Sequence, residues 1–215
     1  MSAAVRVVFA IFCFSVCAQA QTRTLAVYSD SDRHLDSSVA HALQTELQRV
    51  MTPADIEIVS LQSGSKRAEL PEVQLAVVGT FQGDCSVETL PDQRGRAVQT
   101  RTLAESSVSN GRVLPYFRVD CARIIRTLSP VLRPLSVPMR ESILGRALAR
   151  TIAHEIYHIL AQTTGHDKSG IAKASLSLSD LFSSQFDFNP ESLRRMEAPP
   201  SPRISKDVLT VLTRR

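Results

Sequence analysis

The stretch that decides the fold and the chemistry is AHEIYHIL, residues 153–160, which contains the pattern H-E-x-x-H. On a helix, His154 and His158 are one turn apart on the same face, so both imidazoles can bind one metal ion. Glu155 is not needed as a ligand and lies beside the pair, where a carboxylate can accept a proton from water. Two imidazoles and an open position suit zinc better than calcium or magnesium, which prefer oxygen ligands. The pattern therefore predicts one zinc ion with Glu155 as general base.

The flanking residues predict that this stretch is helical. At about 100° per residue one apolar stripe forms, made of Leu148, Ile152, Ile156 and Ile159. The histidines point roughly the opposite way, so the apolar stripe can pack on a sheet while the histidines line a cleft. We expect the helix over about 139–163, with Pro138 placed to open it and Gly165 to close it. The alternative is a surface helix that carries the motif by chance.

A catalytic zinc ion normally has three protein ligands, so a third must come from further along the chain. His166 is the best candidate, because it follows Gly165, a residue that can take a positive φ and turn the chain back after a helix. Asp167 is the alternative, since carboxylates also bind zinc. A loop histidine without a partner is the third possibility for His166.

The order of predicted elements indicates an α+β fold whose N-terminal part resembles an α/β protein. Local patterns favour strands over 24–28, 55–61, 75–79, 98–104 and 113–119, and helices over 35–50, 121–128, 139–163, 176–188 and 204–212. Strand, helix, strand at the start suggests a parallel pair, and Asn110-Gly111 is a strong hairpin turn. We expect a mixed twisted sheet with an antiparallel edge, one backing helix and the long helix of the histidines.

Residues 1–20 have the pattern of an export signal. Arg6 supplies a positive start, 7–16 is apolar, and Ala18-Gln19-Ala20 suits a cleavage site. We expect cleavage after Ala20 and a periplasmic or secreted protein with no stable membrane anchor. A retained N-terminal anchor is the alternative.

The remaining residues, 21–215, are a suitable length for one domain with a real core. We expect an N-terminal subdomain over about 21–163 and a small irregular subdomain over about 164–215. Cys85 and Cys121 are the two cysteines left after cleavage, and an even pair in an exported protein predicts a disulfide. Metal ligation by these thiols is the weaker alternative.

The formal charge of the whole chain is +4, with acids and bases interspersed. Such a mild charge indicates a solvated surface and not a nucleic-acid footprint. We expect a peptide or protein as the substrate, no nucleic-acid partner and a monomer.

His154-Glu155-x-x-His158 followed by a histidine after a glycine resembles the zincin metallopeptidases, and is most similar to their metzincin branch. The resemblance implies that His154, His158 and His166 bind zinc, that Glu155 is the general base, and that the fold is zincin-like. The chain is also similar to small exported bacterial proteins described as zinc proteases.

The sequence departs from the metzincin pattern in three features. The pattern's glycine would fall at Ala161 and its third histidine at Thr164, and no methionine occurs between His158 and Met196. The competing function is a non-catalytic binding or structural protein that keeps a zinc site. Glu155 favours the enzyme, because a binding protein has little need of a carboxylate beside the two histidines.

Overall fold

The computed structural model describes residues 22–29, 35–62, 73–88, 90 and 102–197. The first elements along the chain are β1 (Arg23–Ser29), α1 (Ser37–Met51), a short 3₁₀ turn (Thr52–Ala54), β2 (Ile56–Gln62) and β3 (Leu75–Gln82). β1 lies between β2 and β3 and pairs in parallel with both. The predicted parallel pairing of strands around a helix is therefore confirmed, and α1 ends at Met51, one residue beyond its predicted end.

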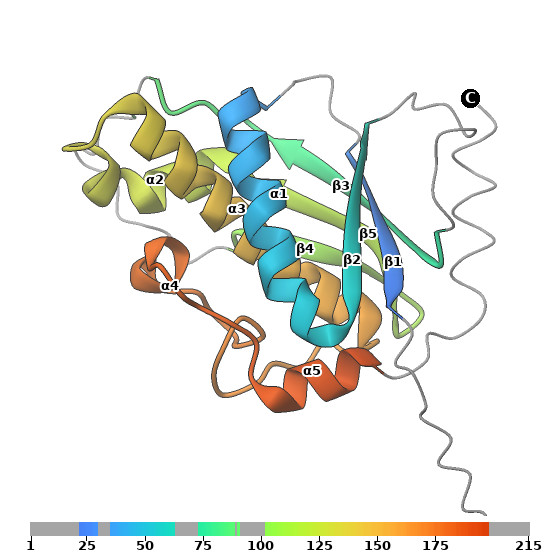
Figure 1. Ribbon diagram of the computed structural model, residues 1–215. Helices are drawn as coiled ribbons and strands as arrows, with labels where there is room; N and C mark the ends of the chain where they lie inside the picture. Colours follow the sequence, from blue (N-terminus) through green and yellow to red (C-terminus); the bar gives the residue numbers. More distant parts are fainter. Residues whose placement is uncertain (1–21, 30–34, 63–72, 89, 91–101, 198–215) are drawn as a thin grey trace, which may run out of the picture.

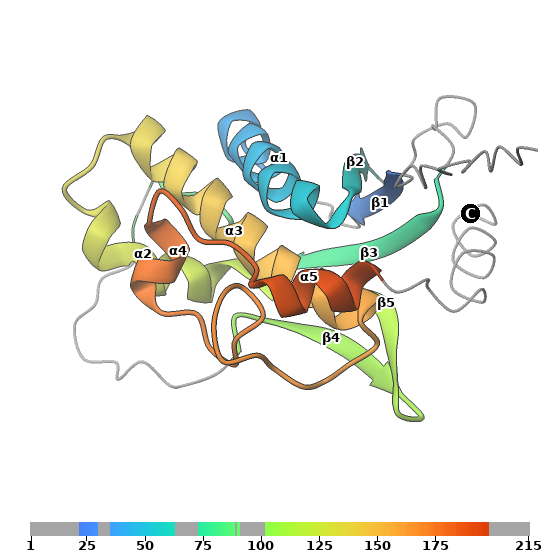
Figure 2. The ribbon, with the colours of Figure 1, turned by 60° about the horizontal axis from the view of Figure 1, so that its bottom comes forward.

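The hairpin at the sheet edge consists of β4 (Ala104–Ser109) and β5 (Arg112–Asp120), which pair antiparallel. Its turn residues Asn110 and Gly111 have φ values of 50° and 72°, as a two-residue type I′ turn requires. β5 also pairs in parallel with β3, so the strand order is β2-β1-β3-β5-β4 and β4 is an outer strand (Figure 2).

The first hairpin strand was predicted over 98–104 but the structure has β4 over Ala104–Ser109. That prediction was wrong because it followed apolar alternation, and an outer strand with mostly exposed residues does not need it. Residues 98–101 lie outside the described part of the chain.

Helices α2 (Cys121–Leu132) and α3 (Val137–Leu160) follow the hairpin. α2 is longer than predicted and includes Pro130, which lies in its last turn. α3 begins with Pro138 in its first turn, as predicted. It ends at Leu160 rather than near Gly165, because Gln162 takes a left-handed φ of 48° and its side chain donates a hydrogen bond of 2.8 Å to the Ile159 carbonyl.

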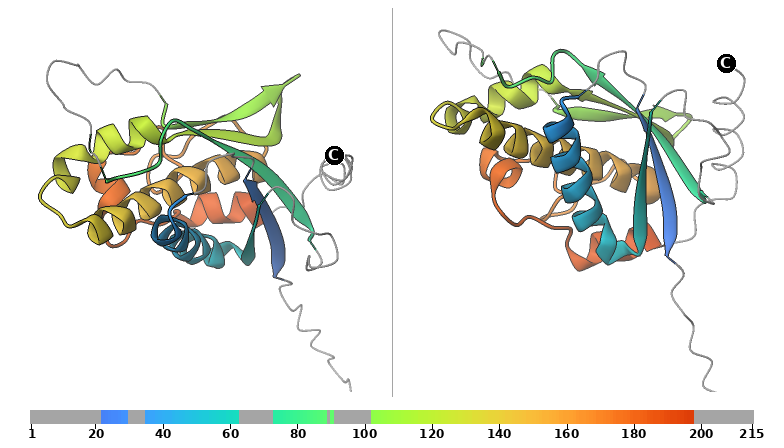
Figure 3. Two further views of the ribbon diagram at one scale, coloured as in Figure 1. Left: turned by 90° about the horizontal axis from the view of Figure 1, so that it is seen from above. Right: turned by 45° about the horizontal axis from the view of Figure 1, so that its top comes forward.

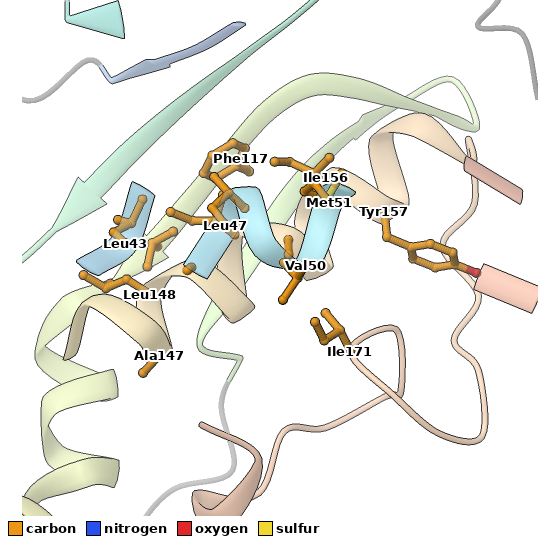
Figure 4. Packing of buried hydrophobic residues seen from close by; sticks show 14 of the residues in the cluster. Leu43, Leu47, Val50, Met51, Phe117, Ala147, Leu148, Ile156, Tyr157 and Ile171 are labelled. Atoms are coloured by element: carbon orange, nitrogen blue, oxygen red, sulfur yellow. The ribbon is translucent and has the colours of Figure 1, made fainter. Parts of the chain in front are cut away.

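The core lies between the sheet and the pair α1 and α3, which pack on one of its faces (Figures 1 and 3). Figure 4 shows Leu47 of α1, Ile156 of α3 and Phe117 of β5 meeting in this layer. The predicted apolar stripe of α3 is at most 1% exposed at all four positions. Burial of this stripe turns the opposite face of α3, with its histidines, away from the core.

The segment after α3 contains α4 (Leu178–Phe182) and α5 (Pro190–Glu197). The helix predicted over 176–188 is thus only one short turn, and α5 occupies a stretch predicted to be irregular. Asn189 caps α5 by accepting a hydrogen bond of 2.8 Å from the Ser192 amide. The mixed five-stranded sheet, its antiparallel edge and the long helix packed on it confirm the α+β prediction.

A disulfide joins Cys85 and Cys121, with a Cα–Cα distance of 5.1 Å, as predicted. It ties the loop after β3 to the first residue of α2. Among the helices that the structure describes, none has the length and apolar character needed to cross a bilayer. The predicted export signal and the helix predicted over 204–212 lie outside the described residues.

Candidate metal centre

Four polar residues line one face of α3 and border a cavity of about 530 Å³: Thr151, His154, Glu155 and His158. Their spacing of three and four residues places them one above the other on a helix. The opposite wall comes from β4, and the ends come from α2 and from the loop after α3. A ligand can therefore reach the motif residues through this cavity without entering the hydrophobic core.

The imidazoles of His154 and His158 are oriented by backbone carbonyls. Nδ1 of His154 lies 2.7 Å from the Ile171 oxygen, and Nδ1 of His158 lies 2.7 Å from the Thr163 oxygen. A carbonyl can only accept a hydrogen bond, so both Nδ1 atoms carry the proton and both Nε2 atoms present a lone pair. Such contacts are the usual outer support of histidines that bind a metal.

The two Nε2 atoms lie 3.0 Å apart. With both Nδ1 atoms protonated, no hydrogen remains to bridge them, so the two lone pairs face one another across a space that suits a cation. Nitrogens bound to a tetrahedral zinc ion at 2.0–2.1 Å are about 3.3 Å apart. The residues present thus fit a metal ion in the manner that the motif predicts.

His166 completes the cluster. The candidate ligand atoms of His154, His158 and His166 all lie within 4.8 Å of one another. The His166 ring stacks on that of His154 with centroids 5.3 Å apart and meets the ring of His158 edge-on at 4.8 Å. The group could hold a metal ion through three imidazoles.

Asp167, the alternative third ligand, is engaged elsewhere. Its Oδ1 accepts a hydrogen bond of 2.8 Å from Arg195, and its Oδ2 accepts hydrogen bonds from Ser192 and Asn189. All three donors belong to α5 or its cap, so this carboxylate joins the loop after α3 to α5. His166 is held near the other histidines partly because its neighbour is fixed in this way.

Two further contacts fix the loop and α5 beside the motif helix. The hydroxyl of the buried Tyr157 accepts a hydrogen bond of 3.0 Å from Arg195. Figure 4 shows the Tyr157 side chain extending away from α3. Gly170 has a φ of 74°, and a Cβ there would lie 2.7 Å from the Asp187 carbonyl oxygen. The next residue, Ile171, is fully buried and offers its carbonyl to His154. The loop thus supplies both backbone acceptors and the third histidine.

Glu155 is 4% exposed, and its Oε2 accepts a hydrogen bond of 2.6 Å from the Ser106 hydroxyl on β4. Burial raises the pKa of this carboxyl, while the Ser106 hydrogen bond and the nearby imidazoles oppose the rise. Burial likewise lowers the pKa of His154 and of His158, which keeps both imidazoles in the neutral form that binds metals.

The hairpin is irregular directly after Ser106. The β4–β5 register pairs Ser106 with Phe117 but Val108 with Val113, so Ser107 alone faces three residues of β5. The middle one is Pro115, which has no N–H to offer a neighbouring strand. Such bulges bend a strand and redirect side chains near sites.

The sequence analysis did not single out Ser106 or the two carbonyl acceptors. Ser106 lies in a strand whose predicted bounds were wrong, so its partner could not be inferred. The carbonyls of Thr163 and Ile171 carry no side-chain signal at all, and only the path of the loop brings them to the imidazoles.

Comparison of the chain with models of known protein families, with curated proteins and with solved structures gave no match in any of the three. The assignment of this site therefore depends on its own geometry and chemistry.

Proposed function

We propose that this chain is an exported zinc-dependent metallopeptidase in which His154, His158 and His166 hold the ion and Glu155 is the general base. The observation that carries the proposal is the pair of Nε2 lone pairs, 3.0 Å apart, beside a buried carboxylate that borders an open cavity. Zinc is the metal proposed, because three imidazoles with an open fourth position are typical of catalytic zinc.

When bound, zinc lowers the pKa of a water molecule toward neutrality and polarises a substrate carbonyl. Glu155 accepts the proton of the attacking water and passes it to the leaving amine. Its raised pKa suits both steps, since a carboxyl must be basic enough to take the proton and acidic enough to release it. The Ser106 hydroxyl occupies one side of Oε2 and holds the carboxylate toward the cavity.

A peptide substrate is supported by the position of β4. This strand pairs with β5 on one side only, so within the described residues its other row of backbone groups is free. Ala104, Ser106 and Val108 border the cavity along the same strand. An extended peptide adds to such an edge through main-chain hydrogen bonds, which would bring a peptide bond alongside the histidines.

The competing function is a binding or structural protein that retains the metal. A structural zinc site needs a closed fourth ligand, and Asp167, a carboxylate next to His166, is held by α5 instead. The open cavity and the buried Glu155 favour the enzyme over this alternative.

The test combines metal analysis with cleavage of a peptide library by the wild type and by Glu155→Gln. This substitution keeps the shape of the side chain and removes its basicity. We expect about one zinc per chain in both proteins and cleavage by the wild type alone. Wild type without metal overturns the proposal, and metal in both with no cleavage supports the binding protein. Equal cleavage by both proteins would reveal a contaminating protease.

A further inference from the structure

The cavity continues past the histidines to a second group of polar residues. At this end α2 contributes Arg123 and Thr127, which are one turn apart and so share a face. The start of β4 lies beside them, because the Asp120 amide donates a hydrogen bond of 2.9 Å to the Leu103 carbonyl. Among the described residues that line the cavity, Arg123 is the sole arginine or lysine.

Asp120 fixes the guanidinium of Arg123. Oδ1 of Asp120 accepts a hydrogen bond of 2.9 Å from the Arg123 backbone amide, and Oδ2 accepts one of 3.1 Å from Nε of the same arginine. The two Nη atoms make no hydrogen bond with the described part of the chain, and the side chain is 19% exposed. Asp120 therefore fixes the orientation of the guanidinium through Nε, while the N–H groups of the two Nη atoms remain available to a ligand.

The two acids that line the cavity within the described part of the chain do not compete for these N–H groups. Glu105 pairs with Arg118 on the neighbouring strand, and Glu155 receives the Ser106 hydroxyl. With Nε engaged by Asp120, the guanidinium still presents the edge formed by its two Nη groups, and this edge matches a carboxylate, to which it donates strong charge-assisted hydrogen bonds. The Nη edge of Arg123 thus has the chemistry of a carboxylate subsite.

We propose that Arg123 binds a carboxylate of the peptide substrate and thereby makes the enzyme selective for anionic peptides. This inference rests on the proposed peptidase function. Leu103 and Ser106 are three strand residues apart, which corresponds to about 10 Å. When the length of the Arg123 side chain is added to this distance, we expect the substrate carboxylate to lie two or three residues from the cleaved bond. It is either an acidic side chain or the C-terminal carboxylate of a short peptide.

The test uses zinc-loaded protein and peptide sets that share one cleavage site. Each set compares glutamate with glutamine at each position up to three residues from that site, and a free C-terminus with a C-terminal amide. We expect kcat/KM to be about 10- to 100-fold higher for the peptide with the carboxylate, the range of a charged hydrogen bond. The position of the effect distinguishes a side chain from the C-terminus.

Three variants locate the effect. Arg123→Gln should abolish the preference while neutral peptides are still cleaved, and the Asp120 cap survives because it uses the Arg123 backbone. Thr127→Glu keeps the guanidinium but places a competing carboxylate one turn away, so it should also abolish the preference. Arg126→Gln, an exposed position on the same helix, is the matched control and should retain it.

Two outcomes overturn the inference: a wild type without preference for carboxylates, or a preference that survives in Arg123→Gln. A binding measurement decides the matter independently of catalysis. Labelled acid and amide peptides are titrated against zinc-loaded Glu155→Gln, with and without Arg123→Gln. Equal affinity for both peptides overturns the carboxylate subsite even if the wild type cleaves. Tighter acid binding without any cleavage supports the subsite and contradicts the peptidase.

Discussion

His166 differs from the other two histidines in how the chain holds it. His154 and His158 lie on a helix, and each has a carbonyl acceptor for Nδ1. His166 lies exposed in a loop, and its position depends on the contacts that Asp167 makes with α5. His166 is therefore the least constrained of the three histidines, and its role in the proposed metal site is the one most worth measuring.

Replacing His166 by alanine removes one of three proposed ligands, so we expect zinc to bind at least about 100-fold more weakly, since loss of an outer-shell partner alone costs 10–100-fold. Competition with a chromophoric chelator measures the dissociation constant. His41→Ala, an exposed histidine on α1, is the matched control and should bind zinc as the wild type does. Unchanged affinity in the His166 variant would mean that the third ligand lies elsewhere.

Ser106→Ala tests whether the β4 hydroxyl positions Glu155. Ser106 donates a hydrogen bond of 2.6 Å to the buried Glu155 carboxylate. Loss of this hydrogen bond should lower kcat by about 10-fold, with little change in KM or zinc content. Ser106→Thr keeps a hydroxyl and should recover much of the rate. Ser107→Ala, the exposed neighbour on the same strand, serves as the control. A similar loss in both alanine variants would indicate a general effect on the strand.

At this scale the sequence predicted that His154, His158 and His166 come together, and it missed the groups that orient them. The H-E-x-x-H spacing alone places two imidazoles and a carboxylate on one helix face, so it required no knowledge of the fold. Ser106 reaches Glu155 across 49 residues of sequence, and the acceptors at Thr163 and Ile171 are main-chain atoms. Such contacts depend on tertiary placement and leave no local pattern.

The α1–α3 contact is the element-level feature that sets the depth of the motif helix. A Cβ at Gly145 would lie 2.6 Å from the Ala42 Cβ and from the Val39 carbonyl oxygen, so the two helix backbones approach closely there. The neighbouring turns bury Leu148 and Ile152 against the same layer. The position of the histidines relative to the sheet thus depends on a residue without a side chain.

Gly145→Ala separates helix propensity from packing. Propensity alone predicts that alanine stabilises α3 by up to about 1 kcal/mol. Because the added methyl meets backbone atoms, we expect a net loss of about 1–3 kcal/mol in the free energy of unfolding, measured by urea denaturation. Ser142→Ala, at an exposed position of α3, should change it by less than about 0.5 kcal/mol. A stabilised Gly145 variant would contradict the close approach.

The elements themselves were predictable where burial imposes a period. α3 and the parallel strands are buried on long faces, and their apolar spacing is visible in the sequence. β4 is an exposed outer strand, and α5 buries only Ser192 and Met196, so neither shows a clear period. A start signal for α5 is nonetheless present in the sequence. Asn189 followed by Pro190 and Glu191 is typical of the start of a helix, although this stretch was predicted to be irregular.

Across the whole molecule, a buried ion pair joins the N-terminal part to the segment after the loop that carries His166. Arg150 of α3 is fully buried and pairs with Glu46 of α1 at 2.8 Å. The same guanidinium donates to the carbonyls of Asp180 and Ser183 around α4. Arg49 also pairs with Glu46 and reaches the Phe186 carbonyl. The Glu46 carboxylate therefore holds Arg49 and Arg150, and these two arginines anchor the segment that lies between the His166 loop and α5.

The protonation of Glu46 should consequently govern stability in acid. Burial by itself would raise its pKa, but the hydrogen bonds from Arg49 and Arg150 outweigh burial and lower the pKa below its ordinary value of 4.5. A carboxyl with a lowered pKa in the folded state stabilises that state above the unfolded pKa. The contribution is lost as the pH falls from about 5 through the lower, folded value.

Glu46→Gln isolates this contribution from those of other carboxylates, which titrate equally in both proteins. At neutral pH we expect the variant to unfold more easily by about 3 kcal/mol, because a buried arginine loses its charged partner. The difference in free energy of unfolding, measured by urea denaturation from pH 7 to pH 3, should shrink as the wild-type carboxylate becomes protonated. Glu57→Gln, an exposed acid on β2, should show neither the loss nor the pH dependence. If the difference in free energy of unfolding between the two proteins stays constant down to pH 3, Glu46 acts by shape and not by charge. The contact between α1 and the segment around α4 would then not depend on the ionisation of Glu46.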